Sequence, residues 1–184
     1  MQIIYITGRG GDASKGLGAY LKELDANRIG LSVNSQFLQL DFHAQVALVS
    51  KLIGDFDSSN TRIIANSYGA YLCLHALIDA PCYLSRFLLL SPVIGAVLDR
   101  QAMVYARLPG CQTFDQAVAE KRLTKPSSLA IHIGSDDMGY SPQPFSQLCS
   151  SLEGCELNVI ENQGHSLDRV TVQGVVHQFL STEA

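Results

Sequence analysis

Short apolar runs alternate along this chain with longer stretches in which apolar residues recur every three or four positions. The first pattern indicates buried strands and the second indicates amphipathic helices. The predicted strands are residues 2–7, 36–40, 61–66, 87–90, 129–133 and 157–160. The predicted helices are, approximately, residues 14–26, 43–54, 68–78 and 167–180. Strands that alternate with helices favour an α/β fold in which helices cover both faces of a mostly parallel sheet.

The stretch Ala65-Asn66-Ser67-Tyr68-Gly69 lies at the junction of a predicted strand and a predicted helix. Small residues around a serine at such a junction are typical of a nucleophile elbow, a tight turn that exposes the serine hydroxyl. A hydroxyl is a weak nucleophile at neutral pH, so it needs a histidine base and an acid that orients this base. The alternative is a serine that only caps the following helix.

Two later loops contain residues that can serve as these partners. The turn Gly134-Ser135-Asp136-Asp137 ends a predicted strand, and Gly164-His165 follows the last predicted strand. Because parallel strands share one carboxyl edge, both loops are expected near the elbow. The remaining histidines lie at the start of, or inside, predicted helices and strands: His43, His75, His132 and His177. His165 is therefore the preferred base.

Four motifs together resemble a small α/β-hydrolase: residues 3–11, 65–69, 134–137 and 164–165. Their order places serine before acid and acid before histidine, as in that fold. In size and motif spacing nearly the whole chain is similar to compact serine hydrolases and esterases, the group that includes the retinoblastoma-binding serine hydrolase and the YqiA-type esterases. The resemblance implies one α/β-hydrolase domain over residues 1–184, with about six strands and a minimal cap. Ala65 stands where the family usually has glycine.

The resemblance also implies a role for each residue of the site. Ser67 is the expected nucleophile and His165 the expected base. Asp137, the second acidic residue of its turn, is the expected acid, with Asp136 as the alternative. The backbone N–H groups of Arg9 and Tyr68 are expected to form the oxyanion hole. The turn that contains Arg9 corresponds to the family's His-Gly-x-Gly motif, with threonine in place of the histidine.

Substrate contacts are expected from two further segments. Residues 95–128 form a stretch longer than one connecting helix, and Pro109-Gly110 divides it into two predicted helical pieces. In the resembling fold an insertion here lies over the strand ends, so we expect a short cap; two ordinary surface helices are the alternative. Met138 and Tyr140 follow the acidic turn and are expected to line the substrate pocket. The expected reaction is hydrolysis of small carboxylic esters or thioesters.

Composition narrows the expected partners. The formal net charge of -4 argues against nucleic acid and anionic membranes, and no apolar run approaches the roughly 20 residues that span a bilayer. The five cysteines form no C-x-x-C pair, which favours free thiols in a reducing cytoplasm. No metal-binding motif or signal peptide is visible. We therefore expect a cytoplasmic enzyme with a small-molecule acyl substrate and no cofactor. Oligomeric state and substrate identity cannot be read from the sequence.

Two other functions compete with serine hydrolysis. Gly8, Gly10 and Ala13 fit a G-x-G-x-x-A turn, and Asp41 follows a predicted strand, as in a Rossmann-type dinucleotide-binding protein. That interpretation leaves the order of Ser67 and its predicted partners unexplained. The second alternative is a non-catalytic interaction protein on a hydrolase scaffold, because a fold alone does not guarantee activity.

Overall fold

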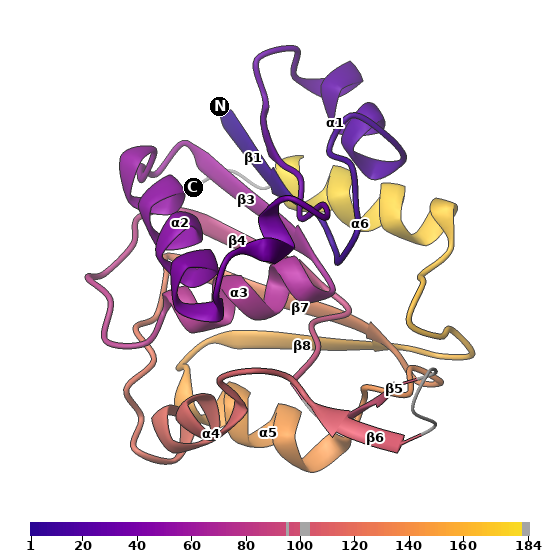
Figure 1. The fold of residues 1–184 in the computed structure, drawn as a ribbon. Helices are drawn as coiled ribbons and strands as arrows, with labels where there is room; N and C mark the ends of the chain where they lie inside the picture. Colours follow the sequence, from indigo (N-terminus) through magenta and orange to yellow (C-terminus); the bar gives the residue numbers. More distant parts are fainter. Residues whose placement is uncertain (95, 100–103, 182–184) are drawn as a thin grey trace.

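Six parallel strands form one sheet in the order β2-β1-β3-β4-β7-β8 (Figure 1). The structure is a computed structural model that describes residues 1–94, 96–99 and 104–181. The strands are β1 Gln2–Ile6, β2 Ile29–Leu31, β3 Thr61–Asn66, β4 Arg86–Leu90, β7 Ser128–Gly134 and β8 Cys155–Ile160. Each neighbouring pair runs parallel. The predicted α/β class and mostly parallel sheet are confirmed.

Helices cover both faces of this sheet (Figure 1). They are α1 Leu17–Leu24, α2 Phe42–Asp55, α3 Tyr68–Ala76, α4 Cys111–Ala119, α5 Pro142–Ser151 and α6 Arg169–Ser181. Ile4 and Ile63 pack into the larger core with α2, α3, α4 and α5, whereas Ile3 and Ile64 pack on the other face with α1 and α6. Alternate residues of a strand point to opposite faces, so a sheet buried on both sides needs continuous apolar strands.

The strand predicted at residues 36–40 is wrong. This segment is a 3-10 turn, η1 Phe37–Gln39, and the true edge strand is β2. The Asn34 side chain accepts a hydrogen bond from the Phe37 N–H at 3.0 Å, which favours a turn, and Leu40 is left exposed. The edge strand escaped prediction because it has only three residues and contains Gly30, so it shows too little apolar pattern.

Two predictions between residues 95 and 151 also need correction. The first predicted helical piece of residues 95–128 is instead an antiparallel hairpin of β5 Ala96–Asp99 and β6 Val104–Arg107; residues 95 and 100–103 lie outside the described part. The hairpin contains valines and a tyrosine, which favour strands. The second piece is the helix α4, as predicted. Helix α5 was not predicted, although Pro142 fits its first turn and Phe145 and Leu148 bury one face.

Candidate active site

The turn after β3 holds Ser67 in a strained backbone conformation, with φ 51° and ψ -115°. Positive φ is costly for a residue with a side chain, and it turns the serine out of the sheet before α3 begins. The Ser67 N–H donates to Leu90 O at 2.8 Å. A Cβ on Gly69 would lie 2.3 Å from Thr7 O and 2.8 Å from Ile6 Cγ2, so only glycine lets α3 approach β1 this closely.

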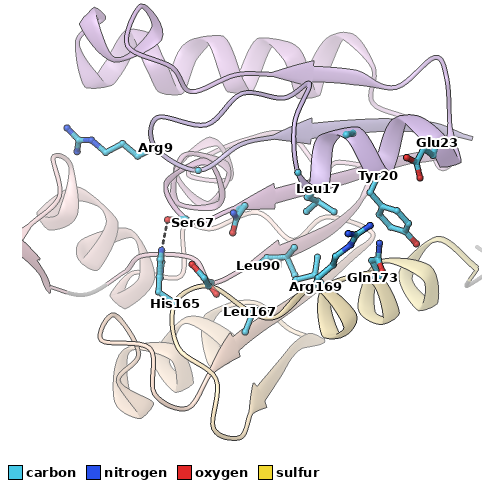
Figure 2. Close-up of a pocket in the computed structure, with 17 residues that line it drawn as sticks. Arg9, Leu17, Tyr20, Glu23, Ser67, Leu90, His165, Leu167, Arg169 and Gln173 are labelled. Carbon is cyan, nitrogen blue, oxygen red and sulfur yellow. Dashed lines mark hydrogen bonds between the residues drawn. The ribbon is translucent and has the colours of Figure 1, made fainter.

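Three side chains from three different loops form one continuous hydrogen-bonded chain (Figure 2 draws its first bond). Ser67 Oγ lies 2.8 Å from His165 Nε2, and His165 Nδ1 lies 2.9 Å from Asp137 Oδ2. Because a carboxylate only accepts, Nδ1–H is the donor and Nε2 is free to accept the serine proton. The Asp137 side chain is 2% exposed and that of His165 is 42% exposed. The bond to Asp137 raises the pKa of His165 above its usual 6.5, against the desolvation that lowers it.

The structure distinguishes the two candidate acids by position. The carboxylate of Asp137 accepts both the His165 ring N–H and the Gly139 N–H, the latter at 2.8 Å. Asp136 is exposed, and its carboxylate accepts the Ser135 hydroxyl at 2.9 Å. Asp137 is therefore the residue that orients the imidazole in this structure.

The acid turn and the histidine loop are packed against each other as one unit. Asp136 N–H donates to Gln163 O at 2.9 Å, and Asn162 N–H donates to Ser135 Oγ at 2.9 Å. A Cβ on Gly134 would lie 1.9 Å from Gln163 O and 2.4 Å from its carbonyl carbon. The absence of a side chain at this glycine is what allows the two loops to meet.

A polar cluster that the sequence analysis missed anchors the other end of the histidine loop. Asp168 caps α6: its carboxylate accepts the Thr171 N–H at 2.9 Å and the Thr171 hydroxyl at 2.7 Å. These bonds to Thr171 lower the pKa of Asp168. Gln163 accepts the Asp168 N–H at 2.9 Å and donates to Thr171 Oγ1 at 2.9 Å and to the Asp168 carboxylate. In the sequence, Asp168 directly precedes an apolar helical pattern, and aspartate is a common N-cap residue at such a position.

The two residues expected to supply oxyanion-hole donors adjoin the elbow: Tyr68 follows Ser67 in the chain, and Arg9 follows Gly8 in the turn after β1. The turn after β1 touches the elbow, since a Cβ on Gly8 would lie 3.2 Å from Ser67 Cβ. In the same turn the Gly10 N–H donates to Val33 O at 2.7 Å, whereas the N–H groups of Arg9 and Tyr68 have no acceptor among the described residues.

The threonine that replaces the family's histidine has a structural contact of its own. Thr7 is buried, and its hydroxyl oxygen accepts the Val33 N–H at 2.8 Å. The neighbouring Arg9 side chain lies over the Tyr68 ring, with its guanidinium carbon 5.8 Å from the ring centroid. The turn after β1 is thus held on one side by the segment that follows β2 and on the other by the elbow.

A cavity of about 790 Å³ opens beside Ser67 and His165, between α1 and α6 (Figure 2). Met138 and Tyr140 do not line it, which contradicts their predicted place on this pocket. The Tyr140 N–H donates to Asp137 O at 2.9 Å, and its ring packs on Phe145 with centroids 5.4 Å apart. Met138 is exposed. The tight turn that follows the acid directs both side chains away from the cavity.

The chain is similar over almost its whole length to several solved structures. It matches SOBER1 of Arabidopsis thaliana at 15% identity and TM-score 0.60, covering 97% of this chain and 96% of that one. The ydeN gene product of B. subtilis matches at 17% identity and TM-score 0.63, covering 98% and 99%. A soluble variant of monoglyceride lipase from Saccharomyces cerevisiae matches at 15% identity and TM-score 0.68, covering 97% and 86%. The chain has the α/β-hydrolase fold. No family model and no curated protein matches it.

The α/β-hydrolase fold replaces the Rossmann interpretation, and local details agree. Asp41 does not end a strand; it caps α2 by accepting the Ala44 N–H at 2.8 Å. Helix α1 begins only at Leu17, so the turn with Gly8 and Gly10 does not open a helix directly. Ala13 is buried and its N–H donates to Ser32 Oγ at 2.9 Å. The geometry that cradles a pyrophosphate is therefore missing.

Two other histidines with lowered pKa values, His75 and His132, do not line the cavity beside the serine. His75 is buried, and burial lowers its pKa to about 4. Burial also lowers the pKa of His132, whose Nε2 lies 3.4 Å from Asn158 Nδ2. Within residues 1–94, 96–99 and 104–181 no group of three His, Cys, Asp or Glu side chains is arranged to hold a metal ion. Over the same residues, no helix has the length and apolar character to cross a membrane.

Proposed function

We propose that this protein is a serine hydrolase that cleaves small carboxylic esters or thioesters through an acyl-enzyme. The observation that carries the proposal is the hydrogen-bonded chain from Ser67 through His165 to Asp137. Such a chain activates a hydroxyl, because the imidazole takes its proton as it attacks. Names of similar structures, among them esterase PE8 and a monoglyceride lipase, agree with this class of reaction.

In the first half-reaction Ser67 Oγ attacks the acyl carbonyl carbon and His165 Nε2 takes the serine proton. When the bond from carbon to the leaving oxygen or sulfur breaks, the same nitrogen gives this proton to the leaving group. Asp137 keeps the other ring nitrogen as an N–H donor and stabilises the imidazolium that forms between the two steps.

The second half-reaction repeats these steps with water. His165 Nε2 takes a proton from the water, whose oxygen attacks the ester carbonyl of acylated Ser67. The bond between the carbonyl carbon and Ser67 Oγ then breaks, and the serine regains its proton from the imidazole. The acid leaves, and the enzyme returns to its starting state.

Negative charge develops on the carbonyl oxygen in both halves, and backbone donors fixed before the reaction stabilise it at little cost. The N–H groups of Arg9 and Tyr68 are suited to this because Tyr68 follows Ser67 directly, Arg9 belongs to the turn that touches the elbow, and neither N–H has an acceptor among the described residues. Tyr68 is the first residue of α3, so the positive end of the helix dipole adds to the effect.

Labelling with a fluorophosphonate probe and hydrolysis of p-nitrophenyl butyrate test the proposal together. Wild-type protein should be labelled and should hydrolyse the ester. Ser67→Ala should abolish labelling, and Ser67→Ala and His165→Ala should each lower turnover by about 10⁴-fold or more. Ser59→Ala, which changes an exposed loop serine, is the matched control. Full activity in both site variants would contradict the proposed roles of Ser67 and His165, whereas wild-type protein that is neither labelled nor active would favour the non-catalytic alternative on the same scaffold.

We also propose a cellular location for the protein and a role for residues 95–128. A cytoplasmic location agrees with five cysteines that are all free thiols. A cap formed by residues 95–128 is the second proposal; the insertion follows β4, whose last residue Leu90 lines the cavity, while none of the described residues of the insertion does. Replacing only the hairpin of β5 and β6 by a short loop, which leaves the core helix α4 in place, should change the preference among acyl chain lengths without abolishing labelling of Ser67.

A further inference from the structure

The cavity beside Ser67 changes in character along its length (Figure 2). Directly beside Ser67 and His165 the lining includes the polar residues Asn66 and Ser166, and three apolar side chains follow at greater distance, those of Leu167, Leu90 and Leu17 (Figure 2). Farther from the serine, between α1 and α6, the lining becomes polar and charged; it is formed there by Tyr20, Glu23, Arg169 and Gln173. A substrate that extends from Ser67 along this cavity would therefore pass the apolar side chains before it reaches the charged ones.

Arg169 differs from most arginines of the described residues. Arg9 likewise has no ion pair or hydrogen bond there, but its guanidinium lies over the Tyr68 ring and is directed away from the other labelled residues of the cavity (Figure 2). The guanidinium groups of Arg107 and Arg122 pair with carboxylates at 2.6 and 2.5 Å, and that of Arg28 donates to Gly18 O at 2.8 Å. That of Arg169 has neither an ion pair nor a hydrogen bond to any described residue, although Glu23 lines the same cavity. Its donors are thus available to a ligand inside the cavity.

We propose that the cavity selects acyl groups that carry a carboxylate beyond a short apolar chain, and that Arg169 binds this carboxylate. The proposal rests on the serine hydrolase function proposed above. A guanidinium presents paired donors that match a carboxylate, and the apolar wall between Ser67 and Arg169 suits methylene groups. The acyl group becomes attached to Ser67 in the first half-reaction and is released only at the end of the second, whereas the leaving group departs after the first; the adjoining cavity is therefore assigned to the acyl group.

Glu23 limits the same subsite from the α1 side. Its carboxylate repels an anionic ligand, and the repulsion increases as the ligand extends toward it. The two charges therefore favour an anion that stops at Arg169 over a longer one. Removing the charge of Arg169 and removing the charge of Glu23 should therefore have opposite effects on one ratio, the kcat/KM for a charged substrate divided by that for a neutral one.

The test compares two p-nitrophenyl esters of equal acyl length, the neutral hexanoate and the anionic hydrogen adipate. Wild-type protein should show the higher kcat/KM for the adipate ester at low salt. Arg169→Gln should lower the ratio of adipate to hexanoate kcat/KM about fivefold, through KM, as expected for loss of a partly exposed ion pair. Arg169→Lys should retain part of the preference, and Glu23→Gln should increase it. Lys22→Gln removes a positive charge from α1 outside the cavity and should leave the ratio unchanged.

Each outcome is decisive. The inference is overturned if wild-type protein prefers the hexanoate, or if Arg169→Gln leaves the ratio unchanged while Ser67 is still labelled by fluorophosphonate; the serine hydrolase function then stands. Absence of labelling together with no turnover of either ester would overturn both. If Lys22→Gln abolished the preference for the adipate ester as fully as Arg169→Gln does, the preference would reflect only the overall charge of the protein. That result would also overturn the proposed subsite.

Discussion

Two histidines lie near opposite ends of helix α3 and have opposite surroundings. His165, from the loop after β8, lies near the start of the helix, and His75 belongs to its last turn. At its start, His165 is partly exposed and both ring nitrogens have polar partners, Ser67 and Asp137. At its end, His75 is buried, and its Nε2 has no hydrogen-bond partner among the described residues. Burial without a charged partner lowers the pKa of His75 to about 4, whereas the bond to Asp137 raises that of His165. A histidine's chemistry thus depends on its partners more than on its place in the chain.

The surroundings of His75 are aromatic. Its ring centroid lies 4.5 Å from that of Tyr71, 4.8 Å from Phe42 and 5.3 Å from Phe114. The Tyr71 hydroxyl donates to Pro109 O at 2.9 Å and so ties this cluster to the loop before α4. We therefore expect changes at the start of α3 to alter activity and changes at its end to alter stability.

After the serine and the histidine themselves, the largest expected effect is at the acid. Asp137→Asn should lower kcat about 10³–10⁴-fold, because an amide can hold the imidazole in the wrong tautomer and cannot stabilise the imidazolium. Asp136→Asn is the matched control in the same turn and should keep nearly full activity. Steady-state hydrolysis of p-nitrophenyl butyrate measures both. A greater loss at Asp136 would mean that the loop rearranges when substrate binds and that the other carboxylate acts.

A smaller loss is expected where the two loops meet. Gly134→Ala places a methyl group against the backbone of Gln163, which cannot move without moving His165. Since a displacement of about 1 Å can cost about 10²-fold in rate, kcat/KM should fall by roughly that factor. Gly174→Ala, on α6 with nothing within 4 Å of the added Cβ, is the control. It should leave activity unchanged and raise stability by up to about 1 kcal/mol. Equal activity of the two variants would show that the loops are not rigidly coupled.

The sequence predicted the centre of this site better than its periphery. Strands buried on both faces and the small residues around Ser67 follow local rules, so β3, α3 and the elbow could be located from the chain alone. The edge strand β2 depends on pairing with the distant strand β1, so its three residues show no pattern of their own. The cap of α6 by Asp168 is a local contact and could have been recognised, whereas the direction of Met138 and Tyr140 is set by a local turn that no periodicity reveals. Arg169 was missed because only the fold brings α6 beside α1.

The next effect concerns stability at the other end of α3. Because the folded pKa of His75 is about 4 and the unfolded value is near 6.5, the unfolded chain binds more protons between these pH values. The free energy of unfolding should therefore fall as pH decreases from 6.5 toward 4. By pH 5 the contribution of His75 to this loss should be about 2 kcal/mol. His75→Leu should remove this loss without changing ester turnover at pH 7.5.

Urea unfolding at pH 7.5 and pH 5.0 measures this difference. His177→Gln, on the exposed side of α6, serves as the control and should leave the pH dependence of the wild type intact. His165 acts in the opposite sense: its raised pKa gives stability that is present at low pH and is lost as pH rises through the folded value. An unchanged pH dependence in His75→Leu would show that water reaches this ring in solution.

The smallest expected effect is a shift of the pH–rate profile, and it separates the two roles of Asp137. Only neutral His165 can accept the serine proton, so kcat/KM should decrease as pH falls below its raised pKa, on a limb that lies above 6.5. In Asp137→Asn the residual activity should show this limb at lower pH, because desolvation, which lowers the histidine pKa, then acts without the carboxylate. A carboxylate that merely held the loop in place would lower the rate and leave the limb where it is. Measuring kcat/KM from pH 5 to pH 9 for both proteins therefore distinguishes a carboxylate that stabilises the protonated imidazolium from one that only positions the ring.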